Sequence, residues 1–150
     1  MISCNSVMNI DITNELFETR EKRWRKRLPD EFKQFIKQNN GGIPNSKMIV
    51  KEKWKVERFL CIVPKISESH NGQFDIDAVI TKYDEYMVFD EDSLGVDLIP
   101  FAQLNHDSLL CLCYKEETPC VVVWEFIGSK EFNPNYIKCY ENFSDFINAF

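Results

Sequence analysis

The sequence predicts an α+β fold for residues 1–150, in which a central, mostly antiparallel β-sheet is flanked by helices. Helix-like spacing of apolar residues occurs towards both ends of the chain. Runs rich in β-branched and aromatic residues fill its middle, and this order is typical of the class. The chain is 44% hydrophobic and has 12 phenylalanines, which is enough apolar material for one core. No repeat, low-complexity tract or long Gly/Ser linker divides it, so we expect a single domain.

A first helix is expected at residues 11–27, ahead of a core region at residues 28–150. Asp11 or Thr13 could cap it, because an oxygen-bearing side chain at a helix start accepts a hydrogen bond from the first turn. Side chains spaced four residues apart define one face: Ile12, Leu16, Arg20 and Trp24. The basic segment, residues 20–27, holds six cations against one acid, a charge of +5, and we expect it to form a basic outer face.

Capping signals mark two more helices. Pro29 predicts a helix at residues 29–39, since proline suits the first helical position, and Gly41 and Gly42 can end it in the left-handed conformation. Asn142 can cap a last helix whose apolar residues follow the i, i+3, i+4, i+7 spacing: Phe143, Phe146, Ile147 and Phe150.

The middle of the chain predicts the sheet. Strand-like runs occupy residues 48–50, 56–63, 98–102, 108–114 and 120–126, and residues 136–140 are expected to add an edge strand. The short connection at residues 115–119 is typical of a hairpin, which favours antiparallel pairing.

Negative charge is concentrated in residues 75–97. Asp75 can cap a helix at residues 75–87, and the acidic segment continues into the loop that follows. Eight carboxylates face a single cation, Lys82, so these residues carry −7, while the whole chain carries −6 and the remainder therefore +1. The eight are Asp75, Asp77, Asp84, Glu85, Asp90, Glu91, Asp92 and Asp97.

Such a surface favours a basic protein partner, because clustered like charges repel one another and steer an oppositely charged molecule. A solvated face is the simpler interpretation of any one of these acids. We expect the partner-binding residues among seven of them: Asp77, Asp84, Glu85, Asp90, Glu91, Asp92 and Asp97.

The basic segment permits several interpretations. Its cations and Trp24 could bind a nucleic acid, but an acidic protein repels a polyanion except locally, so a solvated helix face is favoured and nucleic acid is not the expected partner. The segment could also face the protein's own acids.

Few residues could support catalysis or bind a metal. The triplet His106-Asp107-Ser108 has the residue types of a hydrolytic triad, but consecutive residues cannot aim at one another, and we interpret it as a turn. We therefore expect no enzyme and no cofactor. A zinc site is conceivable, although buried core thiols are favoured, from four cysteines: Cys111, Cys113, Cys120 and Cys139.

The N-terminus, Met1-Ile2-Ser3-Cys4-Asn5, lacks the basic stretch and apolar run of a secretory signal. The sequence contains no apolar run of about 18 residues, the length that a helix needs to span a bilayer. We accordingly expect a cytoplasmic protein, not bound to a membrane, whose six cysteines are free thiols, since the cytosol is reducing.

Six short motifs occur in a specific order: Leu28-Pro29 with Phe32-Lys33-Gln34-Phe35, Asn40-Gly41-Gly42-Ile43-Pro44, Ile99-Pro100-Phe101-Ala102, residues 107–112, Val122-Val123-Trp124, and Asn142-Phe143-Ser144-Asp145-Phe146-Ile147. Together they resemble the SMI1/KNR4 family of the SUKH superfamily. The sequence departs from the family pattern at His106, where glycine is frequent, and at Cys113, where an acid is common.

The resemblance implies a mostly antiparallel sheet flanked by helices, with no catalytic apparatus. It also implies an immunity protein that neutralises a cognate bacterial toxin by direct binding, and an acidic inhibitor suits the basic toxins that attack nucleic acids. A regulatory adaptor of the cell-wall-assembly type is the alternative. A cysteine- or zinc-dependent enzyme is the third possibility.

Overall fold

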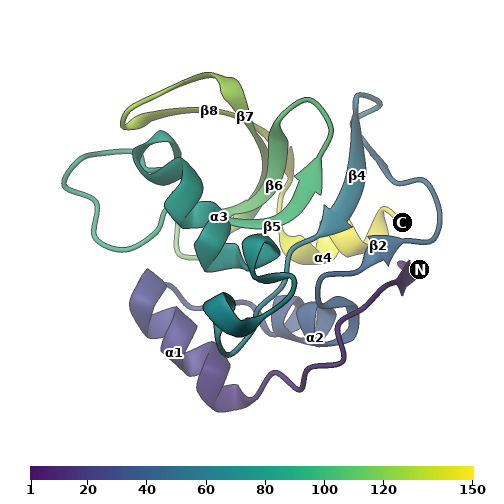
Figure 1. Cartoon of the computed structure of the whole chain (residues 1–150). Coiled ribbons are helices and arrows are strands. Elements are labelled where there is room, and N and C mark those ends of the chain that lie inside the picture. Colours follow the sequence, from purple (N-terminus) through teal and green to yellow (C-terminus); the bar gives the residue numbers. More distant parts are fainter.

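The computed structural model describes residues 1–150 and confirms the predicted α+β class. Six antiparallel strands form a main sheet in the order β3-β4-β5-β6-β7-β8, and β1 and β2 form a separate pair. Figure 1 shows that the main sheet curls strongly at β7 and β8. The strands are β1 (Cys4–Asn5), β2 (Ile43–Pro44), β3 (Ile49–Val50), β4 (Trp54–Phe59), β5 (Leu98–Leu104), β6 (Ser108–Cys113), β7 (Cys120–Lys130) and β8 (Asn133–Tyr140).

Helices cover both faces of the main sheet (Figure 1). On one face Tyr83 packs on Trp124 of β7, with ring centroids 4.8 Å apart. On the other, Phe32 and Phe143 lie 5.9 and 5.4 Å from the ring of Phe101 in β5. None of the helices is both long and apolar enough to cross a membrane. They are α1 (Asn14–Trp24), α2 (Asp30–Asn39), α3 (Ile76–Tyr83) and α4 (Phe143–Asn148), with the 3-10 helices η1 (Ile66–Glu68), η2 (Gly72–Phe74) and η3 (Asp84–Met87).

The first helix starts as predicted and ends earlier. Of the two expected caps, Thr13 is the one used, and its Oγ1 accepts a hydrogen bond of 3.1 Å from the Leu16 N–H. The expected end at residue 27 is wrong, because Arg25 adopts the left-handed conformation with φ of 57°. The Trp24 carbonyl then accepts a hydrogen bond of 2.9 Å from the Val96 N–H. A loop more than 70 residues further along the chain therefore covers the end of α1.

The sheet also differs from the prediction at its margins. The strand expected at residues 56–63 runs instead from Trp54 to Phe59, because the last N–H groups of the expected range bond to side chains and not to β5. The Ile62 N–H donates to Asn40 Oδ1 and the Val63 N–H to Asp75 Oδ2, both at 2.8 Å. β7 and β8 are longer than expected, since their pairing continues to the hairpin tip. The pair β1–β2 was not predicted, as two-residue strands leave no periodicity.

The helix expected at residues 75–87 is divided in two. Asp75 caps α3 as predicted, accepting a hydrogen bond from the Asp77 N–H. Asp84 then adopts a positive φ of 43°, and the chain continues as η3. Asn142 likewise caps α4, through a 2.8 Å hydrogen bond from the Asp145 N–H.

All six cysteines are free thiols. Cys113 and Cys120 are register partners across β6 and β7, and burial raises the pKa of Cys113 to about 12. No group of three or more histidine, cysteine, aspartate or glutamate side chains is arranged to hold a metal ion. The zinc alternative therefore lacks a ligand set.

Candidate protein-binding surface

The acidic segment begins inside the molecule. Asp75 is fully buried, and its carboxylate accepts four hydrogen bonds of 2.8–2.9 Å. Two come from the guanidinium of Arg20, which is itself only 3% exposed, and two from the backbone N–H groups of Val63 and Asp77. Because every acceptor direction is used, this charge joins α1 to α3 and is not offered to a partner.

Two of the predicted partner-binding acids are also held by neighbours. Asp77 accepts a 2.6 Å hydrogen bond from Trp24 Nε1 and forms ion pairs with Arg20 and Arg23. Asp97 is buried, and its Oδ2 accepts a 3.1 Å hydrogen bond from the Phe89 N–H. Asp77 lies near the start of the acidic segment and Asp97 at its end, so these contacts hold both ends of the segment in place.

The other five predicted acids stand on η3 and the loop that follows it. None of them lies within 4.0 Å of a cation, so their charges are uncompensated within the molecule. A 2.8 Å hydrogen bond from the Asp92 N–H to Asp90 Oδ1 shapes the loop. We call these five the acidic surface: Asp84, Glu85, Asp90, Glu91 and Asp92.

A sixth acid, Glu131, joins this surface from the tip of the β7–β8 hairpin. The hairpin is held there by a 2.8 Å hydrogen bond from the Phe132 N–H to the carbonyl of Glu85. The pKa of Glu85 is raised. The largest cause is the nearby charge of Glu131, and partial desolvation and the charge of Asp84 add to it. Sequence reasoning missed Glu131, because nothing near it in the sequence indicates that it lies beside η3.

Aromatic side chains border the acidic surface. The ring of Phe126 lies 5.7 Å from that of Tyr83 and 5.8 Å from that of Tyr86, and Trp124 Nε1 donates a 3.0 Å hydrogen bond to the carbonyl of Tyr86. Phe126 is 42% exposed and the adjoining Ile127 is 70% exposed. We call Tyr83, Tyr86 and Phe126 the aromatic ridge. Exposed aromatic anchors with charges around them are typical of protein interfaces.

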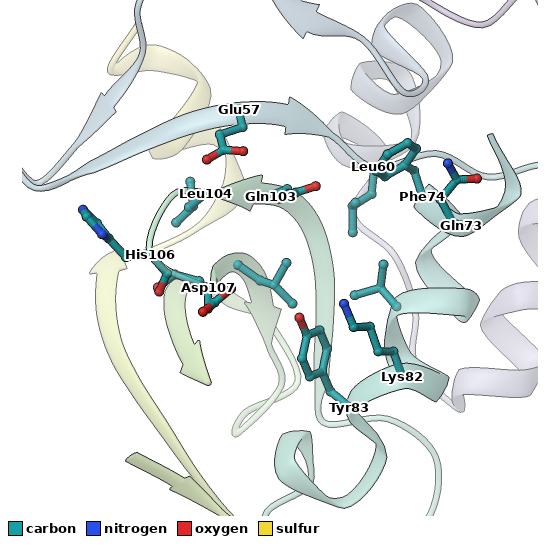
Figure 2. A pocket seen from close by; sticks show the side chains of 13 residues that line it. Glu57, Leu60, Gln73, Phe74, Lys82, Tyr83, Gln103, Leu104, His106 and Asp107 are labelled. Carbon is teal, nitrogen blue, oxygen red and sulfur yellow. The ribbon is translucent and has the colours of Figure 1, made fainter. Parts of the chain in front are cut away.

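On its other side the ridge borders a groove of about 460 Å³. Figure 2 shows Glu57 of β4 on one side of this groove, Tyr83 and Asp107 on the other, and Gln103 of β5 between them. Asp107 belongs to the β5–β6 turn. Its backbone carbonyl accepts a 3.2 Å hydrogen bond from the Phe126 N–H. The groove and the aromatic ridge therefore form one continuous surface.

Two residues of the triplet at the rim of the groove, His106 and Asp107, lie in a turn as predicted, and Ser108 begins β6. His106 and Asp107 have positive φ angles of 60° and 54°, and Ser108 Oγ donates to the His106 carbonyl and not to the imidazole. Glycine adopts a positive φ without a steric penalty, so the glycine implied by the resemblance at the position of His106 would suit this turn. The three side chains form no relay that could activate a nucleophile.

The basic segment is divided between the interior and the surface. Arg20 and Arg23 form ion pairs with the protein's own acids. The interpretation that the segment faces these acids therefore applies to two of its cations. The other four border a shallow surface hollow: Lys22, Arg25, Lys26 and Arg27.

Comparison with known proteins supplies a family. A model of the SMI1 / KNR4 family (SUKH-1) matches residues 11–149, nearly the whole chain. No curated protein and no solved structure matches it.

Proposed function

Because the chain belongs to the SMI1/KNR4 family, we propose that it is a non-catalytic immunity protein that neutralises a cognate toxin by binding it directly. The family is generally non-catalytic and its members are commonly of the immunity type. The proposal includes a cytoplasmic location, where such an inhibitor would meet a toxin that acts inside the cell.

The observation that carries the proposal is an acidic surface without internal ion pairs, placed beside the aromatic ridge. Glu131 lies beside its five acids, and the aromatic ridge, in which Phe126 is 42% exposed, adjoins it. A desolvated aromatic centre supplies most of the affinity of a protein interface, while charges around it set the association rate and the choice of partner.

The charge favours a basic toxin. Proteins that act on nucleic acids carry lysine and arginine where they contact phosphates, and these residues are the complement of the acidic surface. Covering them would block the access of nucleic acid to the toxin. We therefore propose a nuclease-type toxin as the partner.

The test is co-expression with the C-terminal domain of the protein encoded in the adjacent reading frame. We expect the chain to restore growth and to co-purify with that domain alone. In the complex, backbone amides of residues 83–92 and 126–131 should gain protection from hydrogen exchange. Continued toxicity without co-purification contradicts the proposal. Recovery of several unrelated proteins from the host in place of one toxin domain indicates the regulatory-adaptor alternative.

A further inference from the structure

We propose that the groove beside Tyr83 receives an arginine side chain of the basic partner. The inference rests on the proposed function and specifies which chemistry of the partner is recognised. The groove adjoins the aromatic ridge through Tyr83 and through the hydrogen bond between Phe126 and Asp107, so one partner can cover both.

The groove presents acceptors on opposite sides. Glu57 and Asp107 line it, and neither forms an ion pair within the molecule. In Figure 2 the amide of Gln103 lies between the two walls. A guanidinium carries five N–H donors in one plane and can bond to groups on two sides at once, whereas an ammonium acts as a point charge. The arrangement therefore suits arginine better than lysine.

An aromatic face completes the site. Lys82 Nζ already lies 5.2 Å from the centroid of the Tyr83 ring, which shows that this face can hold a cation. The other aromatic ring of the groove, Phe74, is covered by Arg58, whose guanidinium carbon lies 3.6 Å from its centroid. An incoming guanidinium would thus stack on Tyr83 and displace Lys82.

Replacing Lys82 tests whether the groove binds a cation or an anion. With two carboxylates and one ammonium, the groove carries a charge of −1 when its histidine is neutral. Lys82 lies over the face of the Tyr83 ring and repels a second cation, so removing its charge should strengthen the binding of arginine. An anionic ligand would instead lose its only lysine, and the same substitution should weaken the binding of that ligand.

The experiment is an NMR titration of the full chain, labelled with ¹⁵N, with N-acetyl-L-arginine methylamide. The control ligand is N-acetyl-L-citrulline methylamide, which has nearly the same shape and no charge. We expect saturable shifts of the amides of Tyr83, Gln103 and Asp107 with the arginine compound only. Glu57→Gln with Asp107→Asn should weaken binding by at least about threefold, and Lys82→Gln should tighten it by roughly two- to fivefold, the range of exposed ion pairs.

Equal shifts with citrulline, shifts confined to the loop at residues 88–97, or weaker binding by Lys82→Gln would each overturn the inference. Unchanged amide shifts elsewhere in the protein establish that the variants fold. No toxin is used in this titration, so its failure leaves growth rescue and co-purification intact. Failure of those two assays, in turn, refutes the proposed function while leaving the arginine-binding result standing.

Discussion

Replacement of Asp75 by asparagine should be the most damaging single change in the acidic segment. The carboxylate accepts four hydrogen bonds. Two of the donor N–H groups belong to Arg20 and two to the backbone. Asparagine keeps the shape but has one acceptor oxygen, so its NH₂ group must face donors in either orientation. Breaking a buried ion pair from one side costs about 3–5 kcal/mol, because the remaining charge is left uncompensated.

Urea unfolding at pH 7, followed by circular dichroism, measures this loss. The matched control is Asp92→Asn, the same chemical change at an exposed acid, which should alter the free energy of unfolding by less than about 0.5 kcal/mol. Adding Arg20→Met to Asp75→Asn should restore part of the stability, since it removes the unpaired guanidinium. A loss below about 1 kcal/mol for Asp75→Asn, no larger than one ordinary hydrogen bond, would refute the reasoning.

Two further predictions concern the acidic segment. Glu131→Gln should lower the pKa of Glu85 towards its ordinary value, because the repulsion that raises it is removed; a carboxyl ¹³C titration that shows no change would contradict this placement of the hairpin. Gly95→Ala should cost at least about 2 kcal/mol, since this residue has φ of +84° and an added Cβ would lie 2.2 Å from the Trp24 carbonyl oxygen. Hydrogen exchange of the Val96 amide should then accelerate, and an unchanged rate would mean that the loop is not anchored there.

Local signals in the sequence were sufficient for the fold class and the helix starts. Thr13, Asp75 and Asn142 cap the helices that they were predicted to cap, because a cap depends only on the residues of the next turn. The end of α1 could not be predicted in this way. It is set by the hydrogen bond that the Trp24 carbonyl accepts from the distant Val96 N–H.

The candidate surface was predictable only in part, for the same reason. Asp77 and Asp84 are indistinguishable as exposed-looking acids in the sequence, yet Asp77 bonds to Trp24, 53 residues away, while Asp84 has no cationic neighbour. Glu131 reaches Glu85 only because a long hairpin curls over η3. Charge clustering therefore indicated where the negative charge lies, and tertiary contacts determine which of these acids are ion-paired or buried.

The most direct test of the account is the affinity of the chain for the proposed toxin domain, measured by calorimetry at low and high salt. Glu85→Lys, Glu91→Lys and Asp92→Lys together should weaken binding by at least about tenfold and flatten its salt dependence. The matched control reverses three exposed acids elsewhere, Asp11, Glu18 and Glu52, and gives the same net charge. We predict that this control binds like the unaltered protein. Equal affinities for the two triple variants would contradict the assignment of the binding surface.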